Sequence, residues 1–287
     1  MGGCMTICFR AMLLFMLAGL LPDAAHAECA DSAEPCRLEG GREDGTYHLV
    51  LPDEESVPDG LPAVIFLHGW GSDGASVMQN RELVDALVGR GYAVIAPDGS
   101  PRPERNGRSW QFHPERRDGR DEAAFLRAVA DDAAKRFGLD RERMLLGGFS
   151  IGGSMVSYVA CESPESFSAY APVAGSFWDP LPDSCKAPVR LYHTHGWSDG
   201  TVPLEGRAVG NGQMVQGDVF AAMRIWRATN GCGGENPSGF RQSGDFLIRN
   251  WDCDSAFPLT FALHPGGHIV PQGWAGLVLD WYEASAR

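Results

Sequence analysis

Short apolar runs alternate with longer amphipathic segments along most of this chain. The runs have the length of buried strands, and several are followed directly by glycine, proline or another residue typical of turns. They lie at residues 47–51, 63–68, 92–96, 144–147, 169–173, 189–193 and 259–263. Each run predicts a strand of a sheet that is buried on both faces.

The segments between these runs have helical spacing. They lie at residues 77–91, 123–137, 154–160, 219–229 and 274–284. Gly138 follows the second of them, at the position where glycine commonly ends a helix. Strands that alternate with helices predict an α/β fold, with a mainly parallel sheet and helices on both faces. Residues 99–120 are polar and are expected to be irregular.

The first 27 residues have a different character. Arg10 precedes an apolar run at residues 11–21, and Ala25-His26-Ala27 has the small residues of a cleavage site. The run is too short to cross a bilayer, so we predict a secretory signal peptide over residues 1–27. The remainder, residues 28–287, contains no repeat or linker and is expected to be a single domain. The protein is expected to be secreted, to the periplasm or beyond the cell.

Charge narrows the classes of partner. The net charge is −13, and the charged residues are scattered rather than gathered in blocks. This argues against binding to nucleic acid or to an anionic membrane surface, both of which attract basic patches. The oligomeric state does not follow from the sequence.

Cysteine usage agrees with export. Two of the eight cysteines lie in the signal peptide, which leaves Cys29, Cys36, Cys161, Cys185, Cys232 and Cys253. An even number in an exported chain indicates disulfides, although many connectivities are open. We predict that neighbours in sequence pair, as Cys29–Cys36, Cys161–Cys185 and Cys232–Cys253. No Cys-x-x-Cys pair supports a zinc or redox site.

A Gly-x-Ser-x-Gly motif joins the fourth run to the helix that follows it. Residues 148–152 read Gly-Phe-Ser-Ile-Gly. In the context of strand, turn and helix, this motif is the nucleophile elbow of α/β-hydrolases, in which a sharp turn exposes the serine hydroxyl. Ser150 is therefore the candidate nucleophile. The following helix start adds N–H groups and a dipole that favour an oxyanion.

The chain order of the partners is a strict filter. α/β-Hydrolases place the acid after the serine and the histidine last. Of the two histidines in that last region, His268 lies in a glycine-rich loop, whereas His264 is still at a strand end. Asp199 follows a predicted strand and is the candidate acid. Its rivals are expected to be solvated loop charges: Asp179, Asp183, Asp218, Asp245, Asp252 and Asp254.

Two further features concern the same edge of the sheet. The turn at residues 68–71, His-Gly-Trp-Gly, follows an early strand, so the main-chain N–H groups of Trp70 and Ile151 are the candidate oxyanion hole. His68 itself is expected to brace the loop. The pair His193 and His195 lacks a third residue at ligand spacing, so no metal site is predicted.

Together these segments resemble the esterase/polyhydroxybutyrate depolymerase family, which includes feruloyl and acetylxylan esterases of the carbohydrate-esterase family 1 type. The matching segments lie in order at residues 67–72, 140–143, 148–153, 195–203, 226–232 and 266–268. The resemblance implies an α/β-hydrolase fold, a triad of Ser150, Asp199 and His268, and no cofactor. Val270 and Ile151 differ from the residues common at these positions in the family. Both are expected to contact the pocket, so they bear on the identity of the substrate and not on the reaction.

The expected function is therefore that of a secreted serine esterase that acts through an acyl-enzyme. The alternatives are a non-catalytic binding protein on the same scaffold and a peptidase of the same fold. The expected partner is a small or oligomeric ester, either of the feruloyl type or a short hydroxyalkanoate. Four tryptophans are candidate substrate-binding residues, although each could instead anchor the core: Trp110, Trp178, Trp197 and Trp274.

Overall fold

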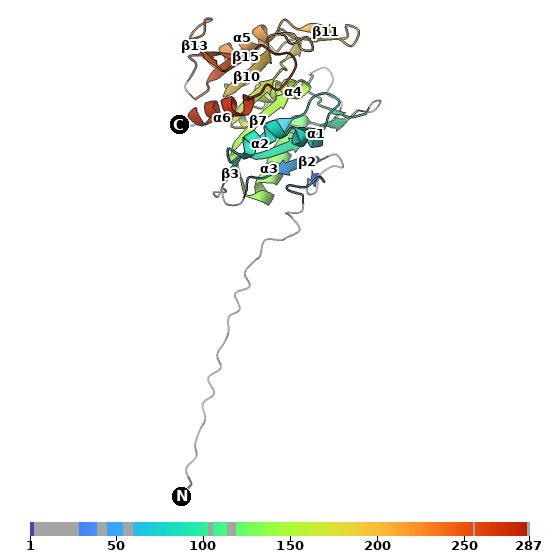
Figure 1. The fold of residues 1–287 in the computed structure, drawn as a ribbon, viewed down its shortest axis with the longest axis vertical. Coiled ribbons are helices and arrows are strands. Elements are labelled where there is room, and N and C mark those ends of the chain that lie inside the picture. Colours follow the sequence, from blue (N-terminus) through green and yellow to red (C-terminus); the bar gives the residue numbers. More distant parts are fainter. Residues whose placement is uncertain are drawn as a thin grey trace.

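A large twisted sheet forms the centre of the molecule (Figure 1). The computed structural model describes residues 1–2, 29–38, 45–53, 60–102, 106–113, 119–254 and 256–285. The predicted signal peptide, apart from residues 1–2, lies outside these ranges. The strand order of the sheet, within the described residues, is β1 (Cys36–Arg37), β2 (Thr46–Val50), β4 (Ala93–Pro97), β3 (Leu61–Leu67), β7 (Leu139–Phe149), β8 (Ala169–Val173), β10 (Leu191–Gly196), β15 (Leu259–His264), β14 (Phe246–Trp251) and β13 (Gly239–Ser243).

The middle of this sheet is parallel. Strands β4, β3, β7, β8, β10 and β15 run in the same direction, whereas β2 pairs antiparallel at one end and β14 and β13 at the other. Parallel neighbours end at the same edge, so the loops after β3, β7, β10 and β15 meet there. This is the α/β-hydrolase architecture predicted from the alternating pattern.

Helices cover both faces of the sheet. Helices α3 (Glu122–Phe137), α4 (Ile151–Glu162) and α5 (Val219–Thr229) pack on one face. Helices α1 (Gly74–Gln79), α2 (Arg81–Val88) and α6 (Trp274–Ala284) pack on the other, where α2 and α6 lie side by side although they are far apart in sequence (Figure 1). Successive residues of β3 serve the two cores: Ile65 points to the first and Phe66 to the second.

Some elements differ from the sequence-based expectation. The helix predicted over residues 77–91 is two helices, because Asn80 ends α1 and its side chain accepts the Leu83 N–H to begin α2. Residues 99–120, predicted to be irregular, contain a short ladder of β5 (Ser100–Pro101) and β6 (Arg108–Ser109).

The hairpin of β13 and β14 was not predicted at all. Its turn is Gly244-Asp245, a two-residue connection typical of hairpins. Most of β13 is exposed, so the apolar alternation that reveals a strand is missing there. A second, small sheet consists of β11 (Arg207–Val209), β12 (Met214–Gln216) and β9 (Trp178–Asp179).

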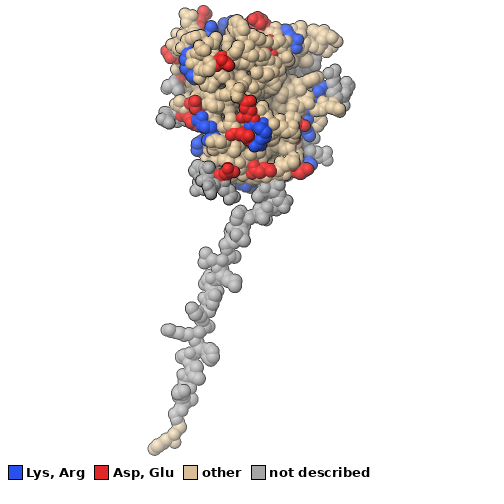
Figure 2. Space-filling model, in the orientation of Figure 1, with Lys and Arg blue, Asp and Glu red and all other residues tan. Residues whose placement is uncertain are grey.

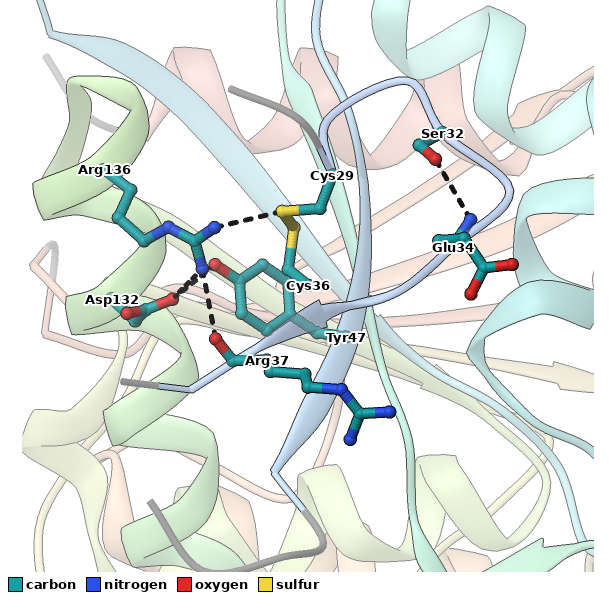
Figure 3. The surroundings of a disulfide bond; sticks show 8 residues. All are labelled: Cys29, Ser32, Glu34, Cys36, Arg37, Tyr47, Asp132 and Arg136. Carbon is teal, nitrogen blue, oxygen red and sulfur yellow. Dashed lines mark hydrogen bonds and ion pairs between the residues drawn. A yellow bond between two sulfur atoms is a disulfide. The ribbon is translucent and has the colours of Figure 1, made fainter. Parts of the chain in front are cut away.

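The structure confirms the three predicted disulfides: Cys29–Cys36, Cys161–Cys185 and Cys232–Cys253. The first of them lies against α3 (Figure 3). There the Arg136 guanidinium donates to Cys29 Sγ and to the Arg37 carbonyl, and its ion pair with Asp132 measures 3.1 Å. The Tyr47 hydroxyl donates to Asp132 Oδ2 at 2.6 Å. These contacts attach β1 and β2 to helix α3.

Charged side chains of both signs are interspersed on the face of the molecule in Figure 2. This agrees with the scattered charge of the sequence. Within the described residues, none of the helices is both long and apolar enough to cross a membrane.

Candidate active site

Ser150 occupies a sharp turn between β7 and α4. Its backbone φ is 59°, a left-handed value that a side chain rarely adopts, and its N–H donates to the Val173 carbonyl of the neighbouring strand β8. Serine at a helix N-cap usually caps the first turn with its hydroxyl. Here the hydroxyl makes no cap bond, so the strained turn directs Oγ away from the helix.

Two glycines make this turn possible. A Cβ on Gly148 would lie 2.7 Å from the Gly152 carbonyl oxygen, and one on Gly152 would lie 2.5 Å from the Leu67 carbonyl oxygen. Both distances are far shorter than a normal contact. The first turn of α4 therefore packs directly against the end of β3, and only glycine leaves room for it.

Three side chains from three strand ends meet at this turn. Ser150 follows β7, Asp199 follows β10 and His268 follows β15. His268 Nδ1 lies 2.8 Å from Asp199 Oδ2, and His268 Nε2 lies 2.8 Å from Ser150 Oγ. Because a carboxylate only accepts, Nδ1 carries the hydrogen, and Nε2 is left to accept the serine hydroxyl proton. The three residues predicted from the motif, the chain order and their positions after strands are thus brought together in the geometry of a Ser-His-Asp relay.

The Asp199 carboxylate is fixed on its other side by main-chain donors. Its Oδ1 accepts the N–H groups of Thr201 at 2.9 Å and Val202 at 2.8 Å. The Asp199 side chain is fully buried, and these hydrogen bonds compensate for the hydration that its carboxylate loses. The remaining oxygen, Oδ2, is the one that faces His268.

The loop after β3 lies beside Ser150. A Cβ on Gly69 would be 3.6 Å from Ser150 Cβ, so the chain passes the nucleophile at close range just before Trp70. Ile151 begins α4 directly after the serine. Ile151 thus adjoins the nucleophile in the chain, and Trp70 follows the residue that passes close to it. The Trp70 ring itself is 55% exposed and stacks under the Arg102 guanidinium.

His68 braces this loop, as the sequence suggested. Its Nε2 accepts the Gly99 N–H at 3.0 Å, and its Nδ1 donates to the Gly69 carbonyl at 2.7 Å. Burial lowers the pKa of His68, so the ring stays neutral and both bonds persist near neutral pH.

The four candidate tryptophans fall into two groups. Trp110 and Trp274 are buried, with 3% and 1% of their surfaces exposed. The Trp110 indole donates to the His68 carbonyl at 3.0 Å, and Trp274 packs against Phe66 on the opposite face of the sheet from α4. These placements favour the interpretation of both residues as core anchors.

The other two lie closer to the elbow. Trp178, half-buried in β9, donates its indole N–H to Ser154 Oγ on the first turn of α4. Trp197 directly follows β10 and is 65% exposed. Trp197 thus presents open aromatic surface after the end of β10, and Trp70, although more than half exposed, has the Arg102 guanidinium over its ring.

In the sequence, His193 and His195 stand out only as a possible metal pair. In the structure both are buried in β10, and His195 contacts the Asp199 turn. Their spacing within one strand, just before the candidate acid, is the signal that could have revealed a supporting role. His264, the rival base, ends β15 and accepts the Gly266 N–H, so it supports the loop that carries His268.

The chain has relatives among curated proteins. A feruloyl esterase B from Piromyces equi is 27% identical over 226 residues, which cover 75% of this chain and 41% of that protein. A probable feruloyl esterase C from Aspergillus clavatus is 27% identical over 278 residues, covering 92% of this chain and 90% of its own length. The chain thus spans less than half of the first relative and nearly all of the second.

Two further comparisons bear on the fold. An acetyl xylan esterase from Aspergillus awamori superposes with a TM-score of 0.66 at 14% identity, covering 87% of this chain and 98% of the other. The prolyl oligopeptidase family matches residues 78–205, less than half of the chain. That stretch includes Ser150 and Asp199 and ends before His268.

Proposed function

We propose that this chain, an α/β-hydrolase related to esterases of that fold, is a serine carboxylic-ester hydrolase. The observation that carries the proposal is the continuous hydrogen-bonded path from Ser150 Oγ through His268 to Asp199. A binding protein that had lost catalysis would have no need to retain all three groups in register. The names of the curated relatives support ester hydrolysis.

The proposed reaction proceeds through an acyl-enzyme. His268 Nε2 takes the proton of Ser150 Oγ as that oxygen attacks the ester carbonyl, and Asp199 stabilises the resulting imidazolium. The main-chain N–H groups of Trp70 and Ile151 stabilise the oxyanion of the tetrahedral intermediate. His268 then protonates the departing alcohol, and the same base activates a water that releases the acid.

Replacement of the nucleophile tests this mechanism. We expect Ser150→Ala to reduce kcat for p-nitrophenyl acetate by a factor of about 10³ or more, because no other group replaces the attacking oxygen. Ser157→Ala is the matched control, since Ser157 is a buried serine of the same helix whose hydroxyl donates to the Gly153 carbonyl. Retained turnover in Ser150→Ala would exclude Ser150 as the nucleophile.

We infer that the substrate is a soluble ester, either of the feruloyl type or a short hydroxyalkanoate oligomer. Trp70 and Trp197 support this, because exposed indole rings provide flat apolar surface for an aromatic acyl group or a sugar face. The feruloyl type is favoured by the names of the relatives.

Substrate choice is tested by comparing kcat/KM for methyl ferulate, a hydroxybutyrate oligomer and p-nitrophenyl acetate. Trp197→Ala should reduce kcat/KM for methyl ferulate by about tenfold and leave p-nitrophenyl acetate nearly unchanged. Phe240→Ala, which removes an exposed ring on the distant edge strand β13, is the control. Efficient erosion of a solid polyester film, with poor turnover of every soluble ester, would contradict the inference.

A second candidate function is peptide hydrolysis, which is favoured by the prolyl oligopeptidase match over residues 78–205. The same nucleophile would serve it. Turnover of p-nitrophenyl esters and of proline-containing peptide anilides, each with and without a covalent serine inhibitor, separates the two. Peptide turnover that exceeds ester turnover would favour the peptidase.

We also propose that the protein is exported and that residues 28–287 form its catalytic unit. The disulfides support export, because such bonds persist in oxidising compartments. N-terminal sequencing of the exported protein should find Glu28 as the first residue. A chain that retains Met1 would contradict this.

A further inference from the structure

The side chain of His195 lies against the turn that holds the proposed catalytic carboxylate. His195 belongs to β10, four residues before Asp199, and none of its surface is exposed. Its Nε2 lies 2.8 Å from the Val202 carbonyl oxygen and 3.6 Å from Asp199 Oδ2. No step of the proposed reaction uses this ring directly.

The contacts of His195 determine its tautomer. A carbonyl oxygen only accepts, so Nε2 carries the hydrogen and donates to Val202. Nδ1 of the neutral ring is then an acceptor, and it lies 3.2 Å from Nε2 of His193, which donates to it. The planes of the two rings are nearly parallel, with 12° between them. His195 is thus held in one orientation from both sides.

The main chain of Val202 links this ring to Asp199. The N–H of Val202 donates to Asp199 Oδ1, and the carbonyl of the same residue accepts from His195. Val202 is therefore fixed at both its donor and its acceptor. If the carbonyl were released, the turn of residues 199–202 could rotate, and the two N–H groups on Oδ1 would leave their positions.

We propose that His195 is a positioning residue that acts through Val202 to aim the Asp199 carboxylate at His268. The ring provides a fixed N–H donor that keeps the turn of residues 199–202 closed. The proposal rests on the proposed function, since it assigns a role within the same triad.

The ionisable groups around His195 come from two strands, β10 and β15, and the loops that follow them. Burial is the main cause that lowers its pKa, Asp199 in its own loop opposes this, and His268 and His264 after and within β15 lower the pKa further. His193, on the same strand, is buried as well, and burial lowers its pKa too. The lowered pKa favours the neutral ring near neutral pH, in which Nε2 keeps its hydrogen as a donor.

A pair of variants of similar size isolates the donor. His195→Gln can place an amide N–H where Nε2 stood, whereas His195→Leu fills the space without a donor. We expect His195→Leu to lower kcat for p-nitrophenyl acetate by about 10- to 100-fold with KM changed by less than about twofold, because misdirected catalytic groups affect the reaction step rather than binding. His195→Gln should recover most of the loss.

The pH dependence of kcat/KM is a readout that would not change if His195 had a merely structural role. Rates are expressed per active site, titrated with a covalent serine inhibitor. In His195→Leu the acidic limb of kcat/KM should move to lower pH, because a misaligned carboxylate stabilises the His268 imidazolium less. His48→Leu removes a buried histidine of β2, which is separated from β10 by four strands of the sheet. This variant should leave the acidic limb of kcat/KM in place.

Proton NMR tests the same point without turnover. The His268 Nδ1–H, in a short bond to Asp199, should give a low-field resonance in the wild type and in His195→Gln. This resonance should be absent in His195→Leu. If His195→Leu does not fold, His195→Asn, whose amide is too short to reach Val202, takes its place. A chain that shows these resonances but hydrolyses no ester would contradict the proposed function and leave the positioning role intact.

Three results would overturn the proposal. The first is a His195→Leu variant with wild-type kcat, pH profile and resonance. The second is a His195→Gln variant as impaired as His195→Leu, because the ring would then act by packing alone. The third is an equal loss in His48→Leu, which would make the effect a general cost of replacing buried histidines.

Discussion

Gly152 shows how closely a single residue can be constrained by its surroundings. A Cβ there would lie 2.5 Å from one backbone carbonyl oxygen and 2.6 Å from the next, at Leu67 and His68. Gly152→Ala is therefore expected to lower the free energy of unfolding by about 1–3 kcal/mol and to displace the loop of residues 68–71. Urea unfolding measures the first effect and ester turnover the second.

Gly276→Ala is the matched control for this substitution. Gly276 lies in α6, and nothing stands within 4 Å of the position its Cβ would take. Alanine should stabilise the helix by about 0.5–1 kcal/mol at that position. If both variants behaved alike, the close approach at Gly152 would have no energetic consequence.

The role of the Asp199 carboxylate can be tested by replacing it with an amide of the same size. Asp199→Asn should reduce kcat by about 10³–10⁴-fold with little change in KM, because an amide favours the wrong tautomer of His268. Asp218→Asn provides the comparison, since Asp218 only accepts the Ala221 N–H at the start of α5, and asparagine caps a helix equally well. Wild-type kcat in Asp199→Asn would remove it from the triad.

Among the elements, the hairpin of β13 and β14 is attached by a disulfide. Cys232 follows α5 and Cys253 follows β14, and the neighbouring Gly233 N–H donates to the Asp252 carbonyl at 2.8 Å. In the chain-entropy model, removing this bridge with Cys232→Ser and Cys253→Ser should destabilise the fold by about 3 kcal/mol. β14 pairs with β15, which leads to His268, so turnover should fall on warming before it does in the wild type.

The Cys29–Cys36 bridge offers an internal scale for that experiment. It closes a loop with a sequence separation of 7, against 21 for Cys232–Cys253. The same model gives about 2 kcal/mol for the shorter loop. Urea unfolding of the two double variants, side by side, tests the order, and a larger loss for the shorter loop would contradict the entropic explanation.

For the molecule as a whole, buried histidines set the response of stability to pH. Burial lowers the pKa of His193 and of His195 below the ordinary value of 6.5. Below about pH 6.5 the unfolded chain binds protons that the folded chain does not, so stability falls as the pH falls. Each such histidine contributes up to about 1.4 kcal/mol per pH unit in that range.

Urea unfolding at pH 7.5, 6.5 and 5.5 measures this dependence. Glu122 acts in the opposite sense, because burial raises the pKa of its carboxyl and the fold takes up that proton more readily. His193→Phe isolates the histidine contribution, and its slope between pH 6.5 and 5.5 should be shallower than that of the wild type. Identical slopes would show that His193 titrates normally in the folded protein.

Much of this architecture was accessible from the sequence. Most strands and helices with a buried face were predicted within a few residues, because burial imposes a period of two or of 3.6 on the chain. Strand β14, which alternates between buried and exposed residues, was missed. The elbow of Ser150 was readable from local turn chemistry. The order serine, acid, histidine narrowed the candidates, and their positions in loops after predicted strands then selected Asp199 and His268. The disulfide pairs were predicted because cysteines that are near in sequence meet at low entropic cost.

Other features were decided only by the tertiary structure. The edge strand β13 has no buried face, so it left no periodic signal. The sequence alone does not distinguish a tryptophan that lines a cleft from one in the core. Only the tertiary packing shows that Trp110 and Trp274 are buried and that Trp197 is exposed. The role of His195 depends on which groups β10 and its loop bring within bonding distance. Periodicity reports the environment of a residue along its own element, whereas contacts across the sheet depend on the order of strands, which no local pattern encodes.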